Sequence, residues 1–382
     1  MLYSLPAEQV AIREMARDFA AEKIAPHALK WDEERHFPVE VFREAAALGM
    51  GGIYVKEDAG GSGLTRLDAA LIFEALAMGC PTVSAYISIH NMCASLIDAY
   101  GSAAQRARYL PALCRMESLT AYCLTEPGSG SDAAALKTTA RLNGSNSDYV
   151  LNGSKQFISG AGAVDYYVVM ARTGGPGPAG VSAILVPADA KGLSFGAIER
   201  KMGWNAQPTR AVIFEDCRVP AENLIGQEGE GFRIALAGLT GGRLNISACS
   251  LGGAQAAVDK AITYMRERTA FGKRLDEFQG LQFRIAEMAT ELEAARNFLY
   301  AAAASYDRGD GDAQMRCAMA KLFVTDAGYA IANKAQQILG GYGYLAEYGV
   351  EKIVRDLRVH QILEGTNEIM RVIIARQVLG VR

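Results

Sequence analysis

Glu364 is the residue of this sequence whose type and position most clearly suggest chemistry. It follows an amphipathic helical pattern and precedes Gly365, which breaks the helix and lets a ligand approach the backbone closely. A carboxylate held among apolar neighbours can have the raised pKa that a general base requires. A simpler explanation is that Glu364 and Glu368 complement the N-terminus of the last helix, and on this segment alone that explanation is favoured.

A second candidate is the glycine-rich segment 122–132, which reads YCLTEPGSGSD. The pattern predicts a strand that enters a loop, where backbone N–H groups and short hydroxyls could face a polar or anionic ligand. A plain surface loop explains the composition equally simply and is favoured for this segment alone. The sequence contains no P-loop, and neither this loop nor the glycines at 60–63 have the strand–turn–helix context of a dinucleotide fold. A bound nucleotide would therefore need another scaffold.

Two further segments lie at predicted helix ends. Arg268 and Phe271 follow one long helical pattern, and residues 337–341 (QILGG) close another. An arginine at a helix end usually complements the helix dipole, and a glycine pair is usually a C-cap. These simple explanations are favoured for each segment alone. The combination of segments is stronger evidence for a functional site than any one of them.

Together, these segments have the order and spacing of the acyl-CoA dehydrogenase family, which the chain resembles from about residue 6 to its end. The family pattern Y-C-x-T-E-P-G-x-G-S-D is matched by residues 122–132. The resemblance implies that the cofactor is FAD and that Ser131 lies where flavin and acyl-CoA meet. The other implied FAD contacts are Tyr122, Leu124, Thr125, Phe157, Ile158, Ser159, Arg268, Phe271, Gln279, Gln337, Gly340, Gly341, Thr366 and Glu368. Because some of these reach a neighbour's cofactor in the family, the resemblance also implies an oligomer, commonly a homotetramer.

The resemblance implies that Glu364 is the catalytic base, which takes the α-proton of an acyl-CoA while FAD accepts the β-hydride. Some members, such as isovaleryl-CoA dehydrogenases, carry the base on an earlier helix beside an arginine. Here that position is Gly242, just before Arg243, so Glu364 is the carboxylate available. The implied substrate contacts are Ser131, Thr240, Arg243 and Gly365.

Within the family, the chain is most similar to the branch that acts on isobutyryl-CoA. The segments that carry this likeness are 203–209 (GWNAQPT), 241–245 (GGRLN), 340–344 (GGYGY) and 363–365 (LEG), whereas Thr240 departs from the expected asparagine. The resemblance implies oxidation of a short, branched acyl-CoA to the 2-enoyl-CoA, with electrons passed to an electron-transfer flavoprotein.

Three alternatives remain open at this point. The chain could prefer straight short-chain or 2-methylbutyryl-CoA, or it could be an acyl-CoA oxidase on the same fold. It could also bind flavin or CoA without catalysis, although the intact Glu364 argues against that. Release of hydrogen peroxide in air would distinguish an oxidase.

The composition excludes several classes of protein. A chain of 382 residues is long enough for two or three domains, and its net charge of −3 argues against nucleic acid as a partner. The seven cysteines include no C-x-x-C motif, as expected for a reducing compartment, and the four histidines are too dispersed to predict a metal site. The sequence shows no targeting segment and no apolar run near the roughly 20 residues of a membrane span. We therefore expect a cytoplasmic protein, or a mitochondrial matrix protein only if the chain is a processed form.

The elements that must position these residues follow from the hydrophobic periodicity. Helical patterns fill residues 7–115 and return over 242–266, 281–307 and 313–339. Between them, β-rich runs occur at 166–171, 181–186 and 211–214, and Asn152-Gly153 predicts a hairpin between strands at 148–151 and 154–158. The predicted fold is α+β, with an N-terminal helical domain (1–117), a middle antiparallel β-domain (118–231) and a C-terminal four-helix bundle (232–382) that carries the base.

Overall fold

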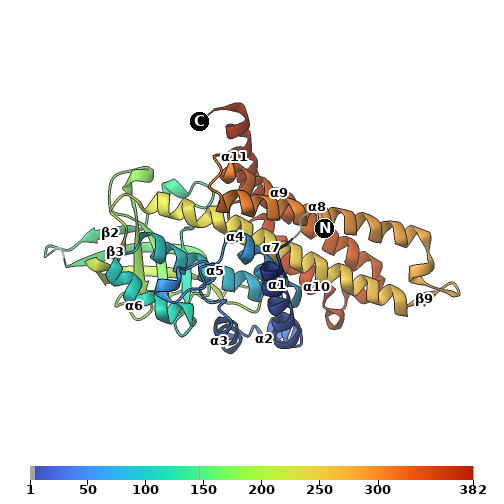
Figure 1. Cartoon of the computed structure of the whole chain (residues 1–382). Coiled ribbons are helices and arrows are strands. Elements are labelled where there is room, and N and C mark those ends of the chain that lie inside the picture. Colours follow the sequence, from blue (N-terminus) through green and yellow to red (C-terminus); the bar gives the residue numbers. More distant parts are fainter. Residues whose placement is uncertain (1–4, 146, 382) are drawn as a thin grey trace.

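A computed structural model describes residues 5–145 and 147–381. Helices precede and follow a β-domain, which lies at one end of an elongated molecule (Figure 1). The helices are α1 (Ala7–Phe19), α2 (Ala28–Glu34), α3 (Val39–Ala47), α4 (Arg66–Gly79), α5 (Pro81–Tyr100), α6 (Ala103–Cys114), α7 (Gly231–Glu267), α8 (Gln279–Asp307), α9 (Ala313–Ile338), α10 (Val350–Arg358) and α11 (Asn367–Leu379). The strands are β1 (Thr120–Cys123), β2 (Thr139–Leu142), β3 (Asp148–Ser159), β4 (Tyr166–Arg172), β5 (Val181–Pro187), β6 (Leu193–Phe195), β7 (Thr209–Pro220), β8 (Leu224–Ile225), β9 (Thr269–Ala270) and β10 (Lys273–Arg274).

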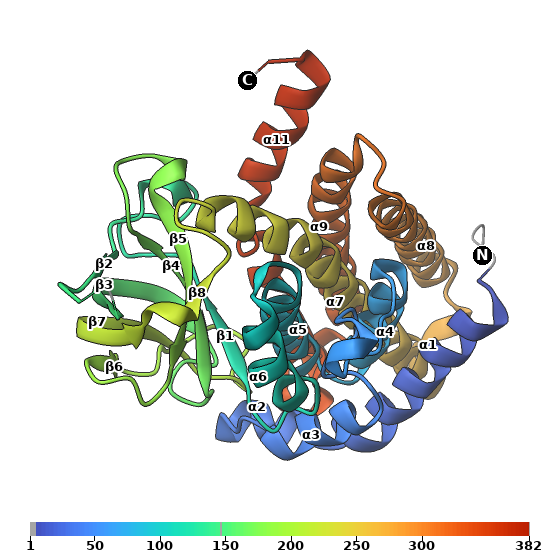
Figure 2. The same ribbon diagram turned by 60° about the vertical axis from the view of Figure 1, so that its left-hand side comes forward.

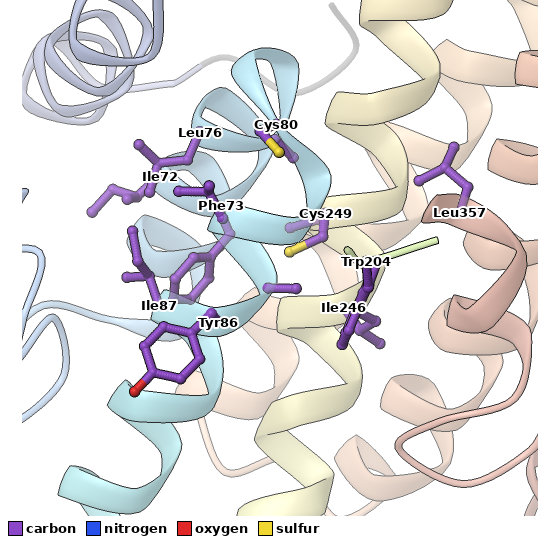
Figure 3. Packing of buried hydrophobic residues seen from close by; sticks show 14 of the residues in the cluster. Ile72, Phe73, Leu76, Cys80, Tyr86, Ile87, Trp204, Ile246, Cys249 and Leu357 are labelled. Atoms are coloured by element: carbon purple, nitrogen blue, oxygen red, sulfur yellow. The ribbon is translucent and has the colours of Figure 1, made fainter. Parts of the chain in front are cut away.

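Helices α4 and α5 form the centre of the N-terminal part. Both are apolar on all sides, as expected for helices that are enclosed by others, and nearly all their side chains are buried. Thr65 caps α4 through a reciprocal capping box with Asp68, and Pro81 occupies the first turn of α5. Their side chains pack with those of α7 and α10 in one continuous core, in which Phe73, Tyr86, Cys249 and Leu357 take part (Figure 3).

The β-domain contains a sheet with the strand order β6-β7-β3-β2-β4-β5-β8, and β1 pairs with β4 (Figure 2). Most neighbouring strands are antiparallel, as predicted. Two pairings are parallel, β1 with β4 and the single residue pair between β2 and β4, so the sheet is mixed. The parallel β1 leads from the helical part directly into the loop at 124–132.

The predicted hairpin at Asn152-Gly153 is wrong. Residues 148–159 form one strand, β3, which pairs with β7 along its length and has a register shift between Leu151 and Gly153. Gly153 has φ +142°, and a Cβ there would lie 2.6 Å from the Thr138 hydroxyl oxygen. Asn-Gly thus marks a bulge where β2 approaches closely, because long-range pairing with β7 outweighs the local turn preference.

The C-terminal part contains the predicted long helices. At 1.5 Å per residue, the 37 residues of α7 span roughly 55 Å, from a start against β5 to an end at the β9–β10 hairpin. Helices α8 and α9 lie beside α7, and α10 packs against α7 and α9, which gives the predicted four-helix bundle. Helix α11 projects from the rest of the molecule in both views (Figures 1 and 2).

Within the described residues, no helix is long and apolar enough to cross a membrane.

Candidate active site

Glu364 lies in a sharp turn between α10 and α11. A 3-10 turn (Val359–Gln361) extends α10, and the N–H of Leu363 still donates to the Val359 carbonyl at 3.0 Å. The backbone then adopts two consecutive left-handed conformations, with φ +57° at Glu364 and +86° at Gly365. A left-handed glutamate is uncommon and marks a position that its surroundings hold in place. We call residues 363–367 the base turn, after the role that the resemblance implies for Glu364.

The Glu364 carboxyl group lies directly against α7. A Cβ at Gly242 would be 2.6 Å from Glu364 Oε2 and 2.9 Å from its carboxyl carbon, so a larger residue at this point of the helix would force the carboxyl group to move. The two family positions for a base therefore face each other in space. Oε2 is buried and has no hydrogen-bond partner among the described residues.

The charges around Glu364 partly offset the effect of its burial. Burial raises the pKa of Glu364 to about 7, while Arg243 and Lys321 favour the ionised carboxylate. Arg243 is only 3% exposed, and its Nε and Nη1 have no hydrogen-bond partners within the described part of the chain. Burial lowers the pKa of Arg243, and Glu364 opposes that change. A carboxyl group with a pKa near neutrality can accept a proton at physiological pH.

Further polar atoms near this carboxyl group are buried without partners. The Tyr122 hydroxyl, in β1, is one of them, and burial is the main reason that its pKa is raised, with Glu364 as the next cause. Such atoms are exceptions in folded proteins and call for a ligand or bound water. The arrangement offers donors at Arg243 and Tyr122 beside an acceptor at Glu364, which suits a ligand with a polar, reactive carbonyl group.

The segment after β1 is held against β3 by a buried ion pair. Lys155 Nζ donates to Glu126 Oε1 at 2.7 Å and to the Leu124 carbonyl at 3.1 Å, and its side chain is fully buried. The Gln156 N–H donates to the Thr125 carbonyl at 2.8 Å, whereas Ser131 lies further along the loop and is exposed. Residues 122–125 and 156–159 are therefore brought together, as the predicted flavin contacts require.

Phe157 stands at a second irregularity of β3. It has φ +61°, lies at a register shift against β7 and is 65% exposed, whereas its neighbour Ile158 is buried and Ser159 is partly buried. A large exposed aromatic side chain in a strained backbone conformation is a suitable surface for a planar ring. The residues of this region fit the isoalloxazine ring of FAD.

A second group of predicted FAD contacts lies around a cavity of about 380 Å³ at the far end of the bundle, which we call the distal cavity. It is lined by Tyr264, Arg268, Leu275, Ile338, Leu339, Gly340, Gly341, Tyr342 and Leu345. Phe271 is 95% exposed in the adjoining β9–β10 hairpin, and Gln279 and Gln337 are exposed at the start of α8 and the end of α9. From Arg243 to Arg268 the rise along α7 is roughly 38 Å, so one chain does not bring this group to Glu364.

The remaining predicted site residues have local hydrogen bonds of their own. The Thr240 hydroxyl donates to the Leu236 carbonyl at 2.8 Å, and Thr366 caps α11 by accepting from the Ile369 N–H at 3.3 Å. Glu368 lies exposed in the first turn of α11, as the helix-dipole explanation expects. The Gly365 carbonyl accepts a hydrogen bond from Lys321 at 2.7 Å.

Lys321 and Asn367 lie beside Glu364 but are not among the site residues that the sequence predicts. Lys321 follows Cys317 by four residues and precedes Val324 and Thr325, so it falls on the buried face of α9. A lysine at an apolar position of an amphipathic helix is the signal that could have identified it, because buried lysines are rare unless they are paired.

Comparisons with known proteins cover almost the whole chain. The N-terminal, middle and C-terminal domains of acyl-CoA dehydrogenase match residues 6–117, 121–217 and 229–379. Mitochondrial isobutyryl-CoA dehydrogenases of Bos taurus and Dictyostelium discoideum are 54% and 55% identical over 98% of this chain and 90% and 89% of their own lengths. The structure of butyryl-CoA dehydrogenase from Megasphaera elsdenii, 37% identical, superimposes with a TM-score of 0.95 over 99% of this chain and all of that chain.

Proposed function

Because the chain belongs to the acyl-CoA dehydrogenase family, we propose that it oxidises a short, α-branched acyl-CoA of the isobutyryl class to the 2-enoyl-CoA. The observation that carries the proposal is the partly buried Glu364, whose Oε2 is enclosed against Gly242 and whose pKa is raised to about 7. The preference for isobutyryl-CoA is supported by the 54–55% identity to two isobutyryl-CoA dehydrogenases.

FAD is the cofactor of this family. In this chain we propose that the flavin is contacted by two adjacent segments, with Ser131 where flavin and acyl-CoA meet. The proposed contacts are Tyr122, Leu124, Thr125, Phe157, Ile158 and Ser159. When bound, FAD supplies the acceptor for the β-hydride of the acyl chain. The second group of contacts is Arg268, Phe271, Gln279, Gln337, Gly340 and Gly341, together with Thr366 and Glu368 on α11.

We propose that Glu364 removes the α-proton of the substrate. Its side chain is the acceptor of the proton, and no hydrogen bond within the described residues uses its backbone N–H. That N–H can therefore donate to the thioester carbonyl, where negative charge develops as the α-proton leaves. The buried guanidinium of Arg243 favours the ionised carboxylate before the proton is taken. Two further proposed substrate contacts are close to this pair in sequence: Thr240 lies two residues before Gly242, and Gly365 directly follows Glu364.

The active species is proposed to be a homotetramer that passes electrons to an electron-transfer flavoprotein. The exposed distal residues begin roughly 38 Å along α7 from Arg243, which supports contacts with a neighbouring subunit's cofactor. The seven cysteines, all free and buried, support a reducing compartment such as the cytoplasm.

A substrate panel on purified protein tests the proposal. The protein should be yellow and should release FAD on acid treatment, and isobutyryl-CoA and 2-methylbutyryl-CoA should reduce the flavin faster than octanoyl-CoA. Because one methylene is worth only about 1–3 kcal/mol in a pocket, straight short chains should overlap with branched ones. Faster reduction by octanoyl-CoA would contradict the isobutyryl assignment, and hydrogen peroxide release in air at the turnover rate would contradict the electron-transfer assignment.

A further inference from the structure

Lys321 is a fully buried lysine on α9 that the proposed reaction does not use. Its side chain is 0% exposed, and its Nζ donates to the Gly365 carbonyl and to Asn367 Oδ1, both at 2.7 Å. Burial of an ammonium group is costly unless the charge is stabilised by hydrogen bonds or an opposite charge. Here both hydrogen-bond acceptors belong to the base turn.

The same turn is attached to α9 by further bonds. Asn367 Nδ2 donates to Asp326 Oδ1 at 2.7 Å and to the Thr325 hydroxyl at 3.1 Å, and Gln361 Nε2 donates to Asp326 Oδ1 at 2.6 Å. Residues on both sides of Glu364 are thus fixed to one turn of α9. This matters because the consecutive left-handed conformations at Glu364 and Gly365 persist only when surrounding contacts hold them.

Lys321 is also one of two cations that act on the carboxyl group of Glu364. The titratable groups that interact electrostatically with Glu364 are Arg243 and Cys249 from α7, Lys321 from α9, Cys93 from α5 and Tyr122 from β1. Burial raises the pKa of both cysteines to about 12 and that of Tyr122 well above its usual range, so these three are neutral at physiological pH. Burial lowers the pKa of Lys321 to about 8, and Arg243 lowers it further, while Glu364, Asp326 and Glu368 favour its charged form. Lys321 is therefore mostly charged at pH 7.

We propose that Lys321 is a positioning residue for Glu364: its hydrogen bonds hold the base turn, and its positive charge favours the ionised carboxylate. The inference rests on the proposed function only in that Glu364 is taken as the base. Lys321 acts through the base turn, because its Nζ is directed to Gly365 and Asn367. Arg243 acts on the same carboxyl group from α7, so cations on two helices favour its ionised form.

The direct test measures the protonation of Glu364 without turnover. Infrared difference spectra of each variant against its Glu364→Gln counterpart isolate the Glu364 carboxyl band as the pH is changed. In Lys321→Met, the pH at which half of the Glu364 carboxyl group is ionised should rise by about 1 pH unit or more. This is the scale expected when an opposite charge at close range is lost. Lys321→Arg, which keeps the charge, should stay within about 0.3 units of the wild type on the same reasoning. Flavin reduction by isobutyryl-CoA should show the same midpoint shifts.

Lys334→Met is a matched control, since Lys334 lies on the same helix but pairs with Glu291 near the surface. Its midpoint should equal that of the wild type. If Lys321→Met does not fold, Lys321→Gln carries the test, because it removes the charge but keeps a donor for the Gly365 carbonyl. An unshifted carboxyl midpoint in the folded neutral variant overturns the inference. A shifted midpoint in a protein that no acyl-CoA can reduce would instead contradict the proposed function and leave the role of Lys321 standing.

Discussion

The base turn and the distal cavity are both sites of predicted function, yet they differ in how much of the site one chain supplies. At the base turn, the carboxyl group, its two cations and its glycine neighbour all come from this chain, and all but the partly buried Glu364 are fully buried residues. At the distal cavity, Phe271 is almost fully exposed and Arg268 extends from a helix end. The buried polar atoms without partners at the base turn thus indicate a small ligand. The exposed aromatic and cationic groups at the distal cavity indicate a larger partner, which we propose is a neighbouring subunit with its FAD.

The largest expected effect follows from removal of the base. Glu364→Gln keeps the size of the side chain but cannot accept the α-proton, so flavin reduction by isobutyryl-CoA should slow at least about 100-fold. FAD content and acyl-CoA binding should match the wild type, because the distal group is untouched. Anaerobic stopped-flow absorbance gives the rate, and bleaching at the wild-type rate would make Glu364 a structural residue.

Gly242→Ala should disturb the same centre without removing a charge. The new methyl group would lie 2.6 Å from Glu364 Oε2, so the carboxyl group must move. A displacement of about 1 Å can cost roughly 100-fold in rate, whereas alanine within a helix does not reduce stability. Gly238→Ala on the same helix is the control, because the nearest atoms to its methyl group would be the Leu96 methyl carbons at 3.2 and 3.4 Å and Met92 Cγ at 3.4 Å. Equal reduction rates in the two variants would contradict the close contact between Gly242 and Glu364.

Arg268→Ala should affect the cofactor and leave the base intact. Loss of one charge-assisted hydrogen bond to the cofactor costs about 2 kcal/mol, which is about 30-fold in FAD affinity. FAD retained after dialysis measures this effect, and protein saturated with FAD should reduce at the wild-type rate. A slower rate at full FAD saturation would show that the two regions are not separate. An active, FAD-replete monomer in light scattering would contradict the contribution of a neighbouring subunit.

The smallest expected effect is a difference in pH dependence between flavin reduction at the base turn and FAD binding at the distal cavity. Glu364 must be ionised to accept a proton, and its pKa is about 7. The rate of flavin reduction should therefore rise about tenfold from pH 6 to pH 8 and then level off, as the ionised fraction does. FAD affinity should change little over this range, because Glu364 is not among the proposed FAD contacts. A flat rate profile would argue against a base that titrates near neutrality.

The sequence predicts the helical parts well because their apolar periodicity depends only on residues three or four positions apart and continues over many turns. Residues 281–307 and 313–339, for example, become α8 and α9 almost unchanged. The hairpin at Asn152-Gly153 fails because local turn preference does not reveal that β7 pairs along all of β3. The resemblance to the family identifies Glu364 and Gly242 as the two possible positions of a base. It does not show that they are in contact, because they lie 122 positions apart in the sequence.

Lys321 illustrates a different limit. Lysine is normally placed at the surface, so its occurrence on a buried face has to be noticed against that expectation. Its partners, Gly365 and Asn367, lie more than 40 residues away, in a turn whose left-handed backbone no local pattern predicts. The residues that we propose to position Glu364 are therefore harder to predict than Glu364 itself.

Exchange of the substrate α-hydrogen tests the central claim most directly, because it follows the proton that Glu364 is proposed to take. Protein with bound FAD is mixed anaerobically with isobutyryl-CoA in D₂O, and NMR measures deuterium at the α-carbon of the acyl-CoA recovered at equilibrium. Return of the exchanged proton from Glu364 should label the α-carbon in the wild type and at least about 100-fold more slowly in Glu364→Gln. Equal rates of α-deuteration in the two proteins would contradict the account, because another group would then be transferring the proton.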